Sequence, residues 1–249
     1  MIRSVLKFIS VAFLCGQSAS AHHTANDQAL ITYDMAIAGI PVGWAAVEFT
    51  VGDTGDYRVD FGLKFEFLFW RGGAAGGAMG KLQAGTAKPR VSDVTVIPEG
   101  SEPVGMWEIF EGNRVKHWSI SPGLDEKYVE GCVPVQEADI QDALDPLSAL
   151  IIAADSAAEA CSRKLPVFVV GTRFDLNLTP ERPLEQGVYS CAVSYKPVSG
   201  HRETSESVGI LLSNNPELTI FEVSPGLWAP HSVSVPTRFG SLSFSRRMR

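Results

Sequence analysis

Apolar and polar side chains alternate with a period of two along much of the sequence, and this pattern constrains the fold more than any other feature. In residues 57–67 (YRVDFGLKFEF) the odd positions are aromatic or aliphatic, and the positions between them are charged apart from Gly62. Successive side chains of a strand point to opposite faces of a sheet. The stretch therefore predicts a strand with one buried and one solvated face.

Shorter stretches with strand-like patterns recur along the chain and are separated by turn residues such as glycine, proline and asparagine. We expect further strands at residues 28–37, 44–51, 81–87, 90–97, 105–111, 114–120, 166–170, 173–178, 187–195, 207–212, 218–223, 232–236 and 240–245. Short strands with turns between them favour a mainly β fold, in which an antiparallel sheet curls into an open or spiralled β-barrel.

One segment departs from this rhythm and predicts a helix. Asp145-Pro146 is a helix-start signature, because the aspartate accepts hydrogen bonds from free amides and proline suits the first helical position. Apolar residues then follow at helical spacing as far as Ala158. We expect a helix at about residues 146–160 that packs on the sheet of a single β-rich domain, residues 22–249. The alternative is two half-barrels joined by this helix.

The N-terminal residues have the pattern of a secretory signal peptide. Arg3 and Lys7 are followed by the apolar run FISVAFL at residues 8–14 and then by Ala19-Ser20-Ala21. Positive charge, a short apolar core and an A-x-A site are typical of a signal peptide, here cleaved near Ala21. The apolar run is far shorter than the roughly 20 residues of a membrane-spanning helix. We therefore expect export without a transmembrane anchor.

The charge of the chain argues against nucleic acid as a partner. Removal of residues 1–21 takes away Arg3 and Lys7 and reduces the 21 basic residues to 19, against 28 acidic residues, a net charge of −9. Affinity for nucleic acid comes largely from basic side chains that neutralise phosphates. The glycine-rich residues 71–80 (RGGAAGGAMG) match neither a dinucleotide fingerprint nor a phosphate-binding loop, and they predict a loop or a strand bent by glycines.

Three cysteines follow the predicted cleavage site, and two of three commonly pair in an oxidising compartment. Cys191 lies in a strand-like stretch and Cys161 just after the predicted helix. We expect a structural Cys161–Cys191 disulfide, with a bridge to Cys132 as the alternative. Neither a C-x-x-C motif nor a zinc-ligand spacing of His and Cys occurs in the sequence, so we expect no metal and no cofactor.

A catalytic residue set is not evident. A Gly-x-Ser-x-Gly motif is missing, and a triad of Ser148, His201 and Asp175 can be assembled only by assumption. Ser148 fits better as part of the helix start, and Asp175 as the partner of Arg173 or of a cation on a neighbouring strand. Several aromatic residues could instead line an apolar cavity, which open barrels commonly contain. The candidates are Trp44, Phe65, Phe67 and Trp107.

A series of short motifs resembles the exported family called domain of unknown function 3108. They occur in consistent order and cover most of the chain after residue 21: Tyr33, residues 39–43 (GIPVG), 145–150 (DPLSAL), 171–175 (GTRFD), 191–201 (CAVSYKPVSGH), 228–230 (WAP) and 235–238 (VPTR). The resemblance implies a β-rich periplasmic protein of Gram-negative bacteria and supplies no catalytic residues.

These observations favour a non-enzymatic, envelope-associated protein that binds an apolar or peptide-like ligand or a protein partner. A hydrolase acting on envelope components and a structural component of an envelope complex are the alternatives.

Overall fold

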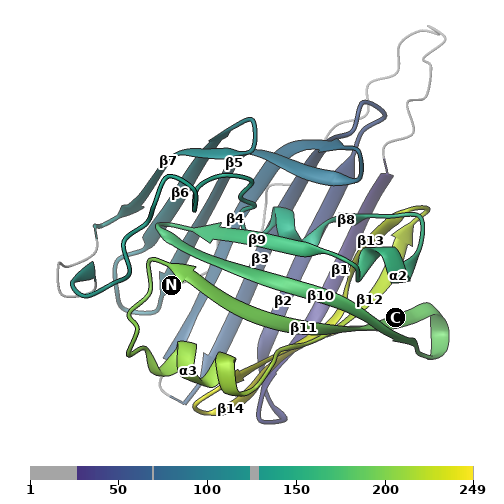
Figure 1. Cartoon of the computed structure of the whole chain (residues 1–249). Helices are drawn as coiled ribbons and strands as arrows, with labels where there is room; N and C mark the ends of the chain where they lie inside the picture. Colours follow the sequence, from purple (N-terminus) through teal and green to yellow (C-terminus); the bar gives the residue numbers. More distant parts are fainter. Residues whose placement is uncertain (1–26, 69, 124–128, 249) are drawn as a thin grey trace, which may run out of the picture.

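The computed structural model describes residues 27–68, 70–123 and 129–248, and within these ranges the protein is mainly β (Figure 1). Fourteen strands form one sheet with antiparallel neighbours, which confirms the predicted fold class. The sheet is open, because its two end strands, β7 and β9, do not pair with each other. The expected signal peptide, residues 1–21, lies outside the described residues.

The first seven strands follow one another as antiparallel hairpins. They are β1 (Asp27–Ile37), β2 (Ile40–Val51), β3 (Asp56–Phe67), β4 (Trp70–Gln83), β5 (Thr86–Pro98), β6 (Val104–Glu111) and β7 (Arg114–Ser121). The strand with the clearest alternation, residues 57–67, is β3. The glycine-rich stretch forms most of β4, whereas the strand expected at residues 81–87 is interrupted by the β4–β5 turn at Ala84 and Gly85, both with positive φ.

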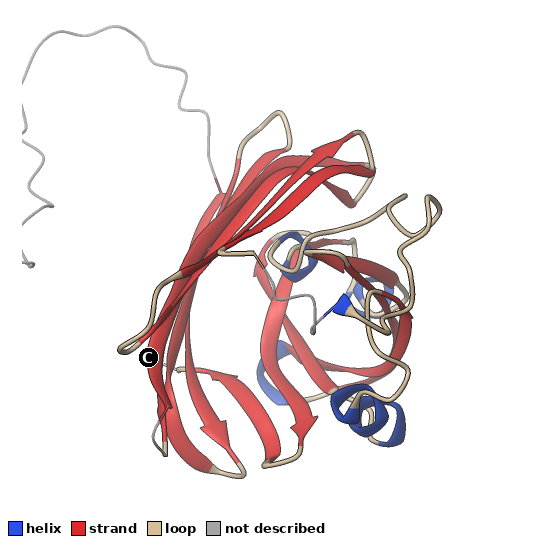
Figure 2. Ribbon diagram, turned by 90° about the vertical axis from the view of Figure 1, so that its left-hand side faces the viewer, coloured by secondary structure: helices blue, strands red, loops and turns tan. Residues whose placement is uncertain are grey.

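The remaining strands extend the same sheet from its other side. They are β8 (Ile152–Ala153), β9 (Lys164–Val169), β10 (Thr172–Pro183), β11 (Val188–Ser199), β12 (Glu217–Ser224), β13 (Leu227–Thr237) and β14 (Gly240–Arg246). The last strand, β14, pairs with β1, so strands from both ends of the described chain lie side by side in the sheet. Figure 2 shows the sheet curling, so that some of its strands, together with the helices, lie on the concave side of the others.

A short segment between the two halves bridges the gap between the sheet edges. The N–H of Val115 on β7 donates to the carbonyl of Ile140 at 2.9 Å. On the other side, Leu144 exchanges backbone hydrogen bonds with β9, donating to Pro166 and accepting from Phe168, each at 2.8 Å. The spiral is therefore held at its seam by a connecting segment rather than by strand pairing.

The prediction of one helix at about residues 146–160 is wrong in its length, because two short helices separated by a strand occupy this range. Asp145 does cap a helical turn, since its Oδ1 accepts hydrogen bonds from the N–H groups of Leu147 and Ser148 at 2.9 Å each. That turn is the 3₁₀ helix η1 (Ser148–Leu150), after which the chain is extended and β8 pairs with β13. A second cap at Ser156 starts the separate helix α2 (Ala157–Ala160). Tertiary pairing of Ile152 and Ala153 with Trp228 and Leu227 of β13 overrides the helical periodicity.

The strand expected at residues 207–212 is also wrong. This stretch belongs to the helix α3 (Glu206–Ser213), and Ser205 caps it by accepting a hydrogen bond from the N–H of Val208 at 3.4 Å. A serine followed directly by an acidic residue is a helix-start signal, and it outweighs the short apolar run. A further 3₁₀ turn, η2 (Glu185–Gly187), connects β10 to β11.

The hydrophobic core draws side chains from both halves of the chain. Phe49 and Val59 of the first half pack in the same cluster as Ile220 of the second half, with exposed fractions of 2%, 0% and 0%. Burial of large side chains from strands distant in sequence supplies the main force that holds the curled sheet together.

Candidate functional site

An apolar cavity of about 420 Å³ lies inside the curl of the second half of the sheet. Its walls come from η1, strands β8 to β13 and α3. The lining residues are Pro146, Ala149, Leu150, Ile152, Leu165, Val167, Thr172, Phe174, Leu176, Leu178, Val193, Tyr195, Leu211, Pro216, Glu217, Leu218, Pro230, Val233 and Val235. Only Thr172, Tyr195 and Glu217 have polar side chains, so the cavity is suited to an apolar occupant.

The alternation of β10 and β11 explains why this wall is apolar. Phe174, Leu176 and Leu178 occupy every second position of β10 and line the cavity. In the antiparallel register, Leu176 lies opposite Tyr195 and Leu178 opposite Val193, so the paired residues of β11 share the same face. Both strands were predicted from the sequence, but the pairing that joins their apolar faces is a tertiary feature.

The opposite face of β10 carries a buried ion cluster. Asp175, 3% exposed, accepts hydrogen bonds from Arg173 on the same strand at 2.9 Å and from Lys164 on β9 at 2.8 Å. Burial acts to raise the pKa of Asp175, but the hydrogen bonds from Lys164 and Arg173 hold it below its usual range. The guanidinium of Arg173 also donates to the carbonyl oxygens of Asp139 and Gln141, at 2.7 and 3.2 Å. The predicted pairing of Asp175 with these cations is confirmed.

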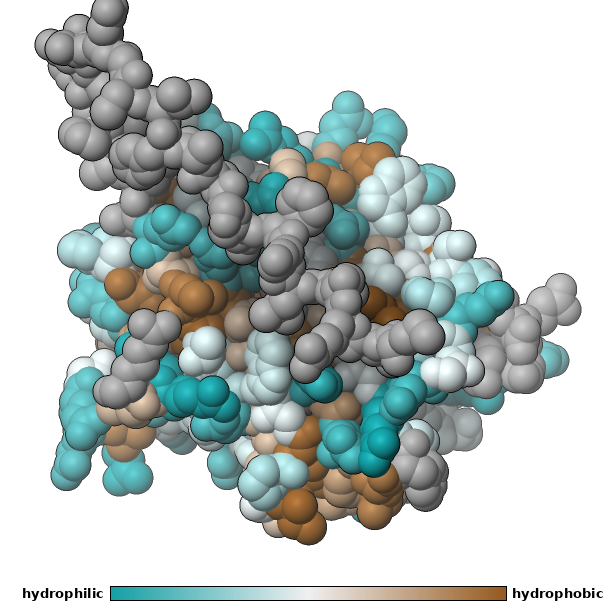
Figure 3. Space-filling model, turned by 180° about the vertical axis from the view of Figure 1, so that it is seen from behind, coloured by the Kyte–Doolittle hydropathy of each residue, from teal (hydrophilic) through white to brown (hydrophobic). Residues whose placement is uncertain are grey.

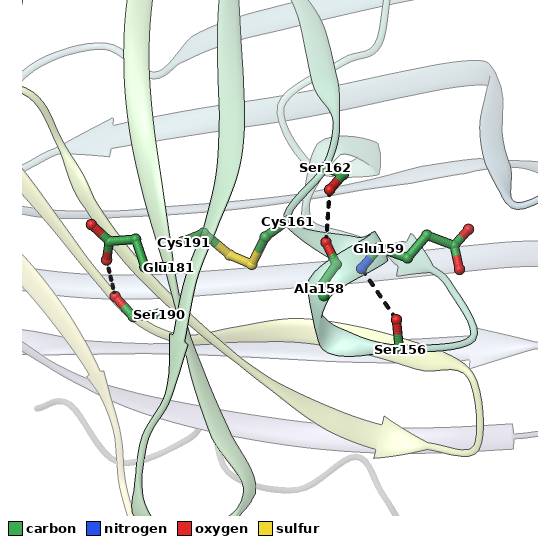
Figure 4. The surroundings of a disulfide bond; sticks show 8 residues. All are labelled: Ser156, Ala158, Glu159, Cys161, Ser162, Glu181, Ser190 and Cys191. Carbon is green, nitrogen blue, oxygen red and sulfur yellow. Dashed lines mark hydrogen bonds between the residues drawn. A yellow bond between two sulfur atoms is a disulfide. The ribbon is translucent and has the colours of Figure 1, made fainter.

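The predicted disulfide joins Cys161, directly after α2, to Cys191 on β11 (Figure 4). Both residues are buried, with exposed fractions of 0% and 2%. The linkage fastens the segment that contains η1 and α2 to a strand of the cavity wall, and it constrains the unfolded chain as well.

Beneath η1, three polar groups form a buried network. The hydroxyl groups of Tyr57 and Ser148 lie 2.6 Å apart, and Ser148 also donates to the carboxylate of Asp145. Burial raises the pKa of Asp145 and that of Tyr57. Because Tyr57 belongs to β3, this network ties η1, whose Ala149 and Leu150 line the cavity, to the first half of the sheet.

The residues of the hydrolase alternative are not brought together. Ser148 is fully buried and is bonded to Asp145 and Tyr57, while Asp175 is bonded to Arg173 and Lys164. The Nδ1 atom of His201 is buried and has no hydrogen-bond partner among the residues that the structure describes. These three side chains therefore do not form a nucleophile–base–acid relay.

The aromatic cavity candidates lie elsewhere, and none of the four lines the cavity described above. Trp44 on β2 and Trp107 on β6 are 45% and 39% exposed. Phe65 and Phe67 on β3 are partly buried and pack against the main core. Phe65 also borders a separate open groove of about 600 Å³, which carries charged residues such as Arg71 and Glu99. The structure thus has an apolar cavity, but the residues that line it are not the four candidates, and most of them are aliphatic.

Among the described residues, His, Cys, Asp and Glu do not cluster in groups of three that could hold a metal ion. Within the same ranges, no helix has both the length and the hydropathy required to span a bilayer. No protein-family model, curated protein or solved structure matches the chain. The site must therefore be interpreted from its own geometry.

Proposed function

We propose that this protein is exported to the periplasm and binds an elongated apolar ligand, such as a single acyl chain, in the cavity beside α3. The observation that carries the proposal is the cavity itself, about 420 Å³ with a lining in which only three side chains are polar. A cavity within the range of about 300–1,000 Å³ typical of ligand sites favours an occupant.

The lining favours an acyl chain over a peptide. A bound peptide needs partners for its backbone N–H and C=O groups, and leaving such groups unpaired is costly. The cavity offers only the side chains of Thr172, Tyr195 and Glu217. An acyl chain makes no such demand, and a polar head could contact these three residues. The same shortage of polar groups gives the hydrolase alternative little support.

Export is supported by two independent observations. The Cys161–Cys191 disulfide is typical of proteins that fold in an oxidising compartment. The order of charge, apolar run and A-x-A at residues 1–21 is that of a signal peptide. The resemblance to domain of unknown function 3108 agrees with this location and stays a prediction.

Titration with the apolar fluorophore N-phenyl-1-naphthylamine tests the binding proposal. We expect saturable fluorescence enhancement that hexadecanoic acid reverses by competition. Leu176→Trp should fill the cavity and weaken the fluorophore's affinity roughly tenfold or more, because overpacking leaves no room for the occupant. Thr179→Trp places the same side chain at an exposed position of β10 and should leave affinity unchanged.

Native mass spectrometry of protein purified from the periplasm supplies an independent readout. A co-purifying lipid that Leu176→Trp removes supports the proposal. If the fluorophore does not bind, or if it binds both tryptophan variants equally, the cavity is not the ligand site.

A further inference from the structure

Three hairpin tips at one end of the molecule carry large apolar side chains that are exposed. Ile40 follows the β1–β2 turn, Leu68 lies in the β3–β4 turn, and Phe239 lies in the β13–β14 turn. Their exposed fractions are 61%, 67% and 40%, and Trp70 beside Leu68 is 45% exposed. We call these four residues the tip patch. Seen from behind, the lower end of the molecule shows a gathering of hydrophobic side chains (Figure 3).

The tips form one continuous surface rather than three isolated spots. Phe239 makes edge-to-face contacts with Trp70 at 5.8 Å and with Phe67 at 6.0 Å between ring centroids, which joins the β13–β14 tip to the β3–β4 tip. The N–H of Ala38 in the β1–β2 turn donates to the carbonyl of Ser241 at 3.0 Å, which joins the third tip. The patch is therefore a fixed part of the fold.

Leu68 is an unfavourable residue for the folded protein in water. Its φ of 57° lies in the left-handed region, where glycine and asparagine are preferred and a leucine is strained. The side chain gains little burial in return, since it is largely exposed. A residue that is both strained and exposed at a turn indicates a role outside the folding of the chain itself.

We propose that the tip patch inserts into the surface of a phospholipid bilayer. A continuous surface of aliphatic and aromatic side chains at one end of the molecule suits insertion into the interface of a bilayer. Arg238 stacks over the ring of Phe239 at 4.6 Å, so its aliphatic part lies on apolar surface while its charge can reach lipid headgroups.

Charge favours a neutral bilayer as the occupant. The positive charges of Arg71 and Arg238 at this end are each offset by a carboxylate. Arg71 pairs with Glu66 at 2.6 Å, and Arg238 lies 3.9 Å from Glu206 on α3. The whole chain has a net charge of −7. Attraction to anionic lipid is therefore weak, and insertion depends on apolar contact.

The position of the patch connects it with the cavity, and this step rests on the proposed function. The ion pair between Arg238 and Glu206 places the β13–β14 tip beside α3, whose Leu211 lines the cavity. Val235, close to the same tip on β13, is another lining residue. An acyl chain could then pass between bilayer and cavity with little exposure to water.

Co-sedimentation with phosphatidylethanolamine–phosphatidylcholine vesicles tests the proposal. We expect wild-type protein to bind them at both low and high salt. The double variant Leu68→Asn, Phe239→Asn should lower the partition coefficient by roughly tenfold or more, since two apolar side chains no longer leave water. Asparagine tolerates the left-handed region, so the change at Leu68 should not destabilise the fold.

A matched control is Leu184→Asn, which alters a leucine, 40% exposed, near the β10–β11 connection and should leave vesicle binding unchanged. Equal binding by wild type and the double variant, or wild-type binding that needs anionic lipid and disappears in salt, overturns the proposal. A wild-type dimer that Leu68→Asn converts to a monomer would assign the patch to a second copy instead. The fluorophore titration is performed without vesicles, so its outcome separates failure of the cavity proposal from failure of the bilayer proposal.

Discussion

Glu108 on β6 accepts a hydrogen bond from the backbone N–H of Val170, with 2.7 Å between Oε1 and N. Val170 lies in the turn between β9 and β10, so this bond joins the end of the sheet formed by β9 to β6, the neighbour of the other end strand, β7. The second carboxyl oxygen of Glu108 accepts from the hydroxyl of Ser92 at 2.9 Å. Glu108 is only 3% exposed and borders a small cavity of about 30 Å³ together with Asp145. The seam of the spiral thus contains two carboxyl groups that are nearly removed from water.

Stability should fall as pH rises from the acidic range to neutrality. Burial raises the pKa of Glu108 from 4.5 to about 7, against the opposing hydrogen bonds from Val170 and Ser92. The folded state then holds a proton that the unfolded state has released, so the free energy of unfolding decreases between about pH 4.5 and pH 7 and levels off above it. The effect should be of order 2–3 kcal/mol. Urea unfolding from pH 5 to pH 8 measures it.

Glu108→Gln provides the control for this prediction. Glutamine can still accept from Val170 but does not titrate, so most of the pH dependence in this range should disappear. The raised pKa of Asp145 acts in the same direction, so the variant should keep a residual slope of the same sign. A variant that keeps the full wild-type slope would show that Glu108 is not the group responsible.

Removal of the disulfide should destabilise the protein substantially. Cys161 and Cys191 are separated by 30 positions in the sequence. Opening a loop of that length costs about 3.5 kcal/mol in the chain-entropy model. We expect the Cys161→Ala, Cys191→Ala double variant to lose at least this much in urea unfolding. Cys132→Ala, which leaves the linkage intact, should lose far less; equal losses would contradict the prediction.

Local patterns predicted the strands and the disulfide because each depends on side-chain alternation or on chemistry within short stretches. Residues 57–67 alternate so regularly that the predicted strand differs from β3 by one residue at its start. Asp145 was identified correctly as a cap. The helix after it was overestimated because periodicity cannot show that Ile152 pairs with Trp228 on a strand more than seventy residues away.

The cavity was harder to predict for the same reason. Its lining combines residues from η1, α3 and six strands, and each of these positions is an ordinary apolar residue in its own element. The sequence favoured large aromatic residues as the lining of a cavity. Trp44 and Trp107, however, occupy solvent-facing positions, and the lining is mostly aliphatic. Register between distant strands, rather than residue type, determines which side chains face the cavity.

Two arginine–aspartate pairs with the same spacing allow a test of burial. Arg173 and Asp175 are buried, whereas Arg58 and Asp60 on β3 form an exposed pair at 2.6 Å. Asp175→Asn leaves the buried guanidinium without a carboxylate and should cost about 3 kcal/mol or more in urea unfolding. Asp60→Asn should cost less than about 1 kcal/mol. Similar costs for the two variants would mean that the Asp175 cluster is not a stabilising feature of the cavity wall.

The close approach of β4 and β5 depends on glycine at specific positions. A Cβ atom at Gly76 would lie 2.0 Å from the carbonyl oxygen of Asp93 and 2.7 Å from the Cα of Val94, both in the backbone of β5. At Gly62, on the neighbouring strand β3, nothing lies within 4 Å of such an atom. Gly76→Ala must therefore push two paired strands apart.

We expect Gly76→Ala to lower the free energy of unfolding by about 1–3 kcal/mol, the usual cost of overpacking. Gly62→Ala should be neutral or stabilising by up to about 1 kcal/mol, because alanine restricts the unfolded chain without a clash in the folded one. Thermal unfolding of the two variants beside wild type gives the comparison. If both alanines are tolerated equally, the close approach of β4 and β5 does not depend on glycine at position 76.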